Sequence, residues 1–390
     1  MADLSQQPLN VTTSGRRLPA LTGMRFLAAA AVFFFHAMYQ GFFASPGVQE
    51  GYVSIFGRGG HLGVGFFFVL SGFVLTWAAR DEDTVGRFWR RRLVKIYPNH
   101  VLTFAVAFIL LTWVSQAVVE RDTAILNFFL LQAWFPQLEV NNSVNSISWS
   151  LSCEVLFYLA FPLLYRLIRR IRPSRLWAWA AVVAVIVAAV PLLSLLLPHQ
   201  PQLPWAPVSE NRFWFIYFFP PVRLLDFVFG MLLARLVITG RRLPFRLGGA
   251  IALTTAAYAL ATLVPGEYAL VAVMLVPVGL VIAAGAAADA AGERSWLASP
   301  AMVWLGNVSF AFYLWHFLVL TYGGRWLGAG WSTPAAIGVL ALLFGVTLLL
   351  SWATFALFEN PIMKRFAGRS RPTPAPAPVP EPEPEPALAK

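Results

Sequence analysis

Ten apolar segments, each close to the length of a membrane-spanning helix, follow one another along this chain of 390 residues. About 20 apolar residues of helix cross the hydrocarbon core of a bilayer, so segments 62–79 and 148–165 are short for this role. Since backbone polar groups must be satisfied within lipid, the pattern predicts an all-α fold, a polytopic membrane helix bundle of about ten transmembrane helices. The predicted spans are 21–43, 62–79, 100–118, 148–165, 176–197, 213–236, 247–264, 268–287, 301–322 and 335–358.

The composition excludes an ordinary soluble protein. Charged residues make up 12% of the chain, whereas soluble domains carry about 25%. A single cysteine, Cys153, excludes an intrachain disulfide framework and a cysteine-rich metal site. The five histidines show none of the usual zinc-ligand spacings, so we expect no metal.

The net charge of +11 could indicate binding to nucleic acid or to a membrane surface. The basic residues fall between the apolar segments and gather on one predicted side, which favours a lipid bilayer over nucleic acid as the partner. This asymmetry predicts that both termini are cytoplasmic in a multi-pass protein of the cell (inner or plasma) membrane. Counting segment 124–135 as a span would invert the arrangement, so we interpret it as interfacial or re-entrant. The basic clusters are Arg16–Arg17, Arg80–Lys95, Arg166–Arg175, Arg241–Arg246 and Lys364–Arg371.

The sequence predicts one membrane domain between two polar segments. We predict a cytoplasmic segment at 1–17, a transmembrane domain at 18–366 and a Pro/Glu-rich cytoplasmic tail at 367–390. Alternating proline at 372–386 denies the tail a hydrogen-bonded structure and leaves it no apolar face to bury, so we expect it to be disordered.

Ionisable residues at membrane depth are the strongest indication of function, because they are unfavourable there unless they are paired or used. Arg25 and His36 both lie in the first span, eleven residues or about 16 Å of helix apart. Arg25 is predicted near the inner interface, and His36 deep in the membrane. The other polar residues predicted in the outer half are His61, Glu154, Arg223, Asp226 and His316.

A second group of cations is predicted on the inner side, after the second span. The connection reads RFWRRRLVKIYP (87–98), which we interpret as a loop. Spacings of three and four residues would bring several cations to one face if the segment were helical. Such a face suits phosphates, by charge and by the forked hydrogen bonds of arginine. The cations are Arg87, Arg90, Arg91, Arg92 and Lys95.

Each feature also has a structural interpretation. The basic segment could only orient the protein and touch anionic lipid. His36 could be a packed, hydrogen-bonded histidine, and Arg223 with Asp226 could be an i,i+3 ion pair.

The remaining polar residues also have structural interpretations. Glu154 could be a paired structural carboxylate, although an isolated one would be unfavourable in the membrane. For His61 and His316 we favour structural roles near the interfaces. The small residues of LSGFVL (70–75) could serve close helix packing.

Seven short patterns follow in order along the membrane region. They are LPALTGMRFLAAAAVFFFH (18–36), GHLGVGFFFVLSGFVL (60–75), RFWRRRLVKIYP (87–98), SWSLSCEVLFYLAFPLL (148–164), RLLDFVFGMLLA (223–234), LGNVSFAFYLWHF (305–317) and FENP (358–361). Together they resemble the acyltransferase-3 family of integral-membrane acyltransferases over about residues 18–365. Asp226 stands where that family has Glu as often as Asp, and His61 is not typical of it.

The resemblance implies an O-acyltransferase. The donor would be cytoplasmic acyl-CoA, most simply acetyl-CoA, and the acceptor a hydroxyl of a sugar, glycan or glycosylated natural product such as a macrolide. The family likeness also implies that His36 is essential and that Arg25 and the basic segment serve the donor. Many relatives carry a fused SGNH hydrolase-like domain, whereas we expect this chain to be the stand-alone form.

A mechanism follows from this interpretation. His36 would take the proton of the acceptor hydroxyl as general base, and Glu154 would orient its imidazole. Arg223 or Ser71 would stabilise the developing oxyanion, and an acyl-histidine intermediate is an alternative to direct transfer. The residues predicted to bind the donor are Arg25, Arg87, Arg90, Arg91, Lys95 and Ser71.

Two rival interpretations use the same residues. A proton-coupled transporter of a small or amphipathic solute would use His36, Glu154, Arg223 and Asp226 as a relay. The sequence shows no internal repeat of the transporter kind, and the basic segment would be left unexplained. A non-catalytic lipid-binding scaffold accounts for the fold but not for Arg25 together with His36.

Overall fold

The computed structural model describes residues 17–80 and 83–366, and every regular element within these ranges is helical. Apart from helices, the described chain shows two isolated β-bridges, Phe43 with Trp331 and Gln202 with Ser209. The predicted all-α class is therefore confirmed. The tail at 367–390 and all but the last residue of the segment at 1–17 lie outside the described residues.

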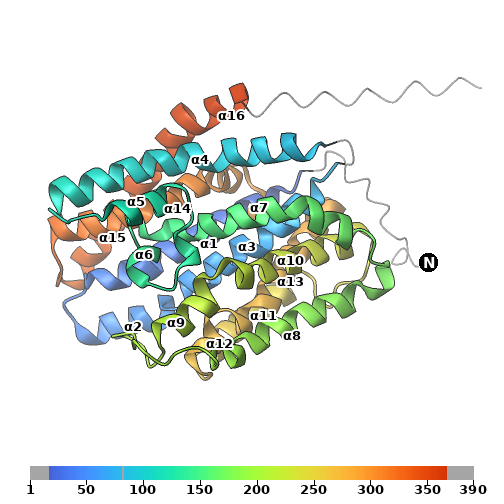
Figure 1. Ribbon diagram of the computed structural model, residues 1–390, viewed down its shortest axis with the longest axis horizontal. Coiled ribbons are helices and arrows are strands. Elements are labelled where there is room, and N and C mark those ends of the chain that lie inside the picture. Colours follow the sequence, from blue (N-terminus) through green and yellow to red (C-terminus); the bar gives the residue numbers. More distant parts are fainter. Residues whose placement is uncertain (1–16, 81–82, 367–390) are drawn as a thin grey trace, which may run out of the picture.

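Long helices lie roughly side by side along the long axis of the molecule (Figure 1). They are α1 (Pro19–Ala37), α3 (Gly59–Trp77), α4 (Val85–Ile109), α7 (Trp149–Ile168), α8 (Leu176–Ser194), α10 (Pro220–Ile238), α11 (Leu247–Leu260), α13 (Ala272–Ala291), α14 (Pro300–Leu327) and α15 (Thr333–Thr354). Shorter helices connect or flank them: α2 (Pro46–Phe56), α5 (Arg121–Phe128), α6 (Leu138–Asn141), α9 (Glu210–Phe213), α12 (Gly266–Leu270) and α16 (Asn360–Phe366).

Eight segments of the described chain are long and apolar enough to cross a membrane. The sixth predicted span corresponds to α10, which carries Arg223, Asp226 and Arg235. The seventh corresponds to α11, whose 14 residues are only about 21 Å of helix. Both helices pack within the bundle, α10 along α3 and α8, and α11 along α13. Eight of the ten predicted spans thus have support from length and composition, and the other two stay predictions.

The apolar segment 124–135 contains no helix long enough to span a bilayer. Helix α5 ends at Phe128 after eight residues, and Leu130 then adopts a positive φ of 57°. The segment is held inside the bundle, because His100 Nε2 of α4 donates to the carbonyl of Asn127 at 3.1 Å. This agrees with its interpretation as interfacial or re-entrant, and it lets α7 begin among buried residues rather than at a surface.

Residues 87–98 are helical, so their prediction as a loop was wrong. Helix α4 begins at Val85 and continues to Ile109, with Pro98 inside it. The Thr84 side chain caps its first turn by accepting from the backbone N–H of Arg87 at 3.3 Å. Arginine and lysine are good helix formers, so this strongly charged stretch extends the third span beyond its apolar part.

Basic residues from several elements lie together at one end of the bundle. The backbone N–H of Ala20, at the start of α1, donates to the Asp289 carboxylate near the end of α13, at 2.9 Å. Just before α11, Arg246 pairs at 3.3 Å with Glu293, which follows α13. The cation-rich start of α4 lies at this end too (Figure 1). The arrangement is the one that the positive-inside rule requires, and the membrane side of the termini stays a prediction.

Two glycines let α3 and α10 approach at backbone distance. A Cβ on Gly72 would lie 1.9 Å from the carbonyl oxygen of Phe227, and one on Gly230 would lie 1.9 Å from that of Val69. Neither clash can be relieved by a side-chain rotation, because the obstructing atom belongs to a neighbouring helix backbone. The close-packing interpretation of LSGFVL therefore holds for its glycine.

We expect Gly230→Leu to destabilise the folded protein by about 3 kcal/mol or more, since α10 would have to move away from α3. A melting curve in detergent, followed by fluorescence-detected size exclusion, measures this. Gly345→Leu on α15 is the matched control, because a Cβ there meets nothing within 4 Å. Equal melting temperatures for the two variants would contradict the packing account.

Candidate active site

Arg25 and His36 lie on one face of α1. Their separation of eleven residues is close to three helical turns, so the two side chains point to the same side of the helix. Val32, between them on this face, is fully buried. Helices α3 and α14 pack along α1. The two groups thus face one interior region at two depths.

His36 meets a second histidine from a distant part of the chain. Its Nδ1 lies 3.0 Å from Nε2 of His316 on α14, and 3.1 Å from the carbonyl oxygen of Val32. His316 is fully buried, and its Nδ1 lies 2.5 Å from the carbonyl oxygen of Tyr313. The two imidazoles come from helices that share a large packed interface.

These contacts determine which nitrogens carry protons. A nitrogen facing a carbonyl oxygen must be an N–H donor, so Nδ1 of His316 is protonated and its Nε2 is an acceptor in the neutral ring. Nδ1 of His36 faces both the Val32 carbonyl and that acceptor, so it also carries its proton. Nε2 of neutral His36 is therefore left with a free lone pair, which is what a general base requires.

Among the described residues no hydrogen bond joins Glu154 to His36, although the predicted orienting role would need one. Its carboxylate accepts from Tyr158 Oη at 3.0 Å, and Ser71 hydrogen-bonds the same hydroxyl. The backbone carbonyl of Tyr158 accepts from the indole of Trp89, in the second turn of α4. Because α7 begins inside the bundle, Glu154 belongs to the inner polar region rather than to the outer half.

Three cations from two helices surround this inner region. Arg25 of α1 lies within electrostatic range of Glu154, Tyr158 and Glu359. Lys95 of α4 is already engaged, because Glu359 binds it with one carboxylate oxygen and accepts from Asn99 with the other. Glu359 is only 3% exposed, so this ion pair is part of the packed interior.

Arg92, the third cation, faces inward on α4. Its guanidinium lies over the rings of Phe88 and Tyr158, at 5.8 and 5.9 Å, and its buried Nε has no hydrogen-bond partner. The cluster of Arg25, Arg92, Lys95, Glu154 and Glu359 carries three positive and two negative charges. It can therefore attract an anion, and Arg92 has a free donor to bind one.

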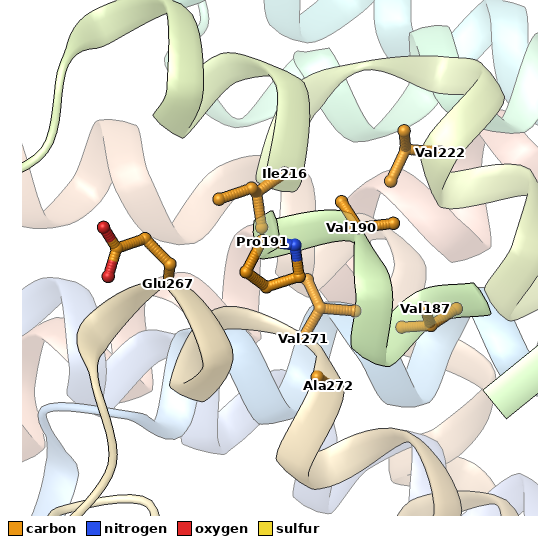
Figure 2. A pocket seen from close by; sticks show the side chains of 8 residues that line it. All are labelled: Val187, Val190, Pro191, Ile216, Val222, Glu267, Val271 and Ala272. Atoms are coloured by element: carbon orange, nitrogen blue, oxygen red, sulfur yellow. The ribbon is translucent and has the colours of Figure 1, made fainter. Parts of the chain in front are cut away.

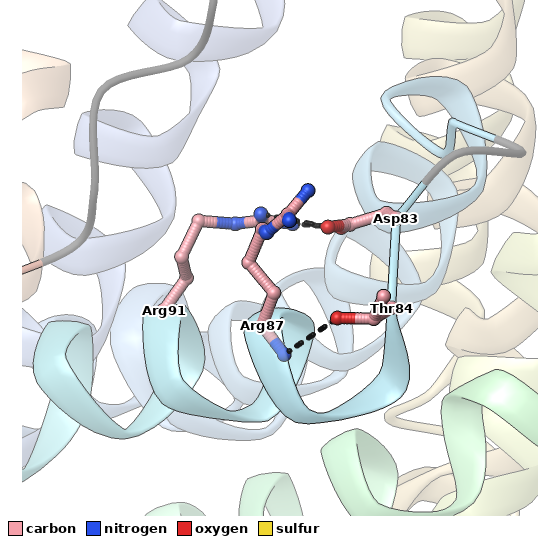
Figure 3. A network of polar contacts seen from close by, with 4 residues as sticks. All are labelled: Asp83, Thr84, Arg87 and Arg91. Carbon is pink, nitrogen blue, oxygen red and sulfur yellow. Dashed lines mark hydrogen bonds and ion pairs between the residues drawn. The ribbon is translucent and has the colours of Figure 1, made fainter.

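The other predicted donor-binding cations lie at the start of α4. Arg91 forms an ion pair with Asp83 through both carboxylate oxygens, while Thr84 caps the backbone of Arg87 (Figure 3). Arg87 and Arg90 are exposed. They stand at a helix N-terminus, where the helix dipole adds to their attraction for anions.

Arg223 is placed apart from His36, in a neighbouring cavity. Its Nη2 lies 2.7 Å from Oδ2 of Asp226, and both side chains are 1% exposed. The predicted i,i+3 ion pair is therefore present. Its guanidinium covers the rings of Phe68 and Tyr217 at 5.0 and 5.5 Å. No described hydrogen bond joins Arg223 to His36, and Ser71 lies with Glu154, so the two predicted oxyanion donors are in different places.

A pocket where the end of α8 meets the starts of α10 and α13 carries no comparable chemistry. Figure 2 shows aliphatic side chains facing one another, with the Glu267 carboxylate directed away from them. The pocket has no space for a water molecule. It is lined by Val187, Val190, Pro191, Ile216, Val222, Glu267, Val271 and Ala272.

The sequence left several residues of the site without their partners. A structural role was favoured for His316 and none was given to Glu359, although both lie in the quoted patterns LGNVSFAFYLWHF and FENP, because hydropathy gives no sign of their partners. Tyr158 is four residues after Glu154, a spacing that predicts contact on a helix. Arg92, Lys95 and Asn99 recur at three and four residues, which identifies the inward face of α4 once the segment is known to be helical.

Comparisons with known proteins agree with the patterns. A family model for the acyltransferase domain (acyltransferase 3) matches residues 18–356. The chain is 42% identical over 369 residues to acyltransferase MdmB of Streptomyces mycarofaciens, covering 91% of this chain and 94% of that protein. It is 23% identical over 385 residues to peptidoglycan O-acetyltransferase OatA of Listeria monocytogenes, covering 90% of this chain but 56% of that protein. For O-acetyltransferase OatA of Staphylococcus aureus the identity is 22%, over 90% of this chain and 58% of that protein. No solved structure matches the chain.

Proposed function

Since the chain belongs to the acyltransferase-3 family and is a membrane acyltransferase, we propose that it transfers an acyl group from acyl-CoA to a hydroxyl of a carbohydrate-bearing acceptor. Acetyl-CoA is the simplest donor, and the cell membrane is the proposed location. The single observation that carries the proposal is the position of His36, with a free Nε2, on the same face of α1 as Arg25 and the inner cationic cluster. Membership of an acyltransferase family also decides against the transporter and scaffold interpretations.

The donor is proposed to bind from the cation-rich end of α4. Exposed Arg87 and Arg90 would meet the phosphates first, next to the positive end of the helix dipole. Arg92 and Arg25 lie further in, on the way to His36. Lys95 would act mainly by holding Glu359, because its ammonium is already paired. An extended acyl-thioester arm would then run along the face of α1 that carries Arg25 and His36.

The transfer step uses the free lone pair of His36. The acceptor oxygen attacks the thioester carbonyl carbon while its proton moves to Nε2, so that an ester C–O bond forms and the C–S bond breaks. The proton then passes to the leaving thiolate, which restores neutral His36 and releases CoA. His316 would accept the hydrogen bond from Nδ1–H of His36 and so orient the His36 ring. The same hydrogen bond would stabilise the His36 imidazolium, which is the role of the third group in a nucleophile–base–orienter arrangement. The same Nε2 could form the alternative acyl-histidine.

The test is an assay of purified protein in detergent with labelled acetyl-CoA, with and without carbohydrate acceptors. We expect CoA release that increases with a suitable acceptor, together with a labelled ester. Absence of both CoA release and ester from wild-type protein across short-chain acyl-CoA donors would refute acyl-CoA dependence.

Neutralising Arg90 and Arg91 together, as R90Q/R91Q, should raise the KM for acetyl-CoA several-fold to about tenfold. Arg90 is exposed, and Arg91 is half-buried and already paired with Asp83, so the two charges should contribute modestly. Their effect should shrink as salt increases. The KM for the acceptor should change little. R172Q/R175Q is the matched control, since both arginines are exposed in another basic connection. Equal effects of the two double variants would mean that α4 has no special role in donor binding.

A further inference from the structure

A small cavity beside the proposed catalytic histidines has polar groups on one wall and aliphatic side chains on the other. Its polar wall contains His61, Arg223 and Asp226, and its free volume of about 10 Å³ is room for about one water molecule. The rest of the lining is Gly65, Val69, Leu270, Val271, Met274, Leu275 and Val278.

The charged pair in this wall lacks hydrogen bonds. Although Nη2 of Arg223 and Oδ2 of Asp226 are in ionic contact, neither the guanidinium nitrogens nor the carboxylate oxygens have a hydrogen-bond partner of good geometry. Buried charges without hydrogen bonds are strongly unfavourable, so a polar group in the cavity would stabilise the pair. Such a group must both donate, to the carboxylate, and accept, from the guanidinium.

A neutral hydroxyl meets this requirement best. It carries one O–H donor and two acceptor lone pairs, whereas a phosphate has acceptors only at neutral pH and would face the Asp226 carboxylate. The CoA phosphates are thereby disfavoured here. The aliphatic wall offers no partner to a second charged group, and the volume fits a single hydroxyl, so the carbon skeleton that bears it would lie outside the cavity.

The cavity is near His36 and is kept open by a glycine. The Phe35 ring contacts the imidazoles of both His36 and His61, at centroid distances of 5.0 and 5.3 Å. A Cβ built on Gly65 meets nothing within 4 Å, so the free space at this position results from the absence of a side chain rather than from close helix packing.

We propose that this cavity is an acceptor subsite, in which Arg223 and Asp226 bind a non-reacting hydroxyl of the acceptor while another hydroxyl meets His36. The proposal rests on the proposed function. Before the acceptor arrives, a water molecule takes the place of the hydroxyl. Recognition by a donor–acceptor pair would select hydroxylated acceptors without requiring them to be charged.

The experiment follows transfer from labelled acetyl-CoA to methyl β-D-glucopyranoside, a neutral sugar glycoside, and separates glycoside ester from free acetate. Gly65→Leu fills the cavity without a backbone clash. The double variant R223M/D226L removes both charges and leaves no orphaned partner, so it remains foldable. Gly338→Leu is the matched control, because a Cβ on this α15 glycine also meets nothing within 4 Å.

In both cavity variants the KM for the glycoside should rise about tenfold or more, the effect of losing hydrogen bonds to charged groups. Their KM for acetyl-CoA should stay near the wild-type value, and Gly338→Leu should behave as wild type. The subsite is refuted if both variants transfer to the glycoside as wild type does, or if wild type releases CoA but forms no glycoside ester. Wild-type protein that releases no CoA at all would instead refute the proposed function.

Discussion

Replacing His36 with alanine should reduce acyl transfer by about 10²–10⁴-fold, the usual effect of losing a general base, or abolish it if an acyl-histidine forms. Nε2 of His36 is the one imidazole nitrogen of the His36–His316 pair that the hydrogen bonds leave unprotonated and unpaired. The measurement is the rate of ester formation from labelled acetyl-CoA by purified His36→Ala and by wild-type protein at equal protein level. Equal melting temperatures of the two proteins show that the variant is folded.

His199→Ala is the matched control for this variant. His199 is exposed and contacts Arg212 in the connection between α8 and α9. We expect its replacement to leave transfer unchanged. Near-normal transfer by His36→Ala would show that His36 serves only in packing. The general-base mechanism would then be wrong.

Replacing His316 with leucine should lower the turnover rate by about tenfold or more, since Nδ1–H of His36 would lose its acceptor and the imidazolium its stabilising partner. His316→Gln should recover much of the rate, because a glutamine side-chain oxygen can reach roughly the position of Nε2 and accept the same hydrogen bond. The measurement is kcat for both variants at saturating donor.

The comparison of the two variants separates positioning from packing. A purely structural His316 would be replaced better by leucine than by a polar amide in this buried place. Equal rates for His316→Leu and His316→Gln, or a faster leucine variant, would therefore contradict the positioning role.

Hydropathy predicted the long helices well, because crossing a bilayer imposes both length and composition. Its main error was at residues 87–98, where charge was taken as the sign of a loop. A transmembrane helix can extend past the hydrocarbon core, and Thr84 followed by helix-forming arginines was a readable start signal. Helix α11 is short and helix α10 carries charges. For these two helices, length and composition alone do not decide whether they span the membrane.

The site was predictable in part. A single-helix relation, such as the shared face of Arg25 and His36, follows from spacing alone. Contacts between helices do not, because they depend on packing that no local pattern encodes. His316 is 280 residues from His36, and Glu359 is 264 residues from Lys95. Glu154 was grouped with His36, whereas it contacts Tyr158 and lies near Arg25 and Arg92, because α7 begins among buried residues.

The sidedness of donor use tests most directly whether acyl-CoA enters at the cation-rich start of α4. Membrane vesicles containing the protein are prepared in inverted and right-side-out orientations and given labelled acetyl-CoA, which does not cross the bilayer. We expect CoA release from inverted vesicles, where the start of α4 faces the medium, and its loss in His36→Ala vesicles of the same orientation. Release from sealed right-side-out vesicles and not from inverted ones would show that the donor does not enter at the start of α4.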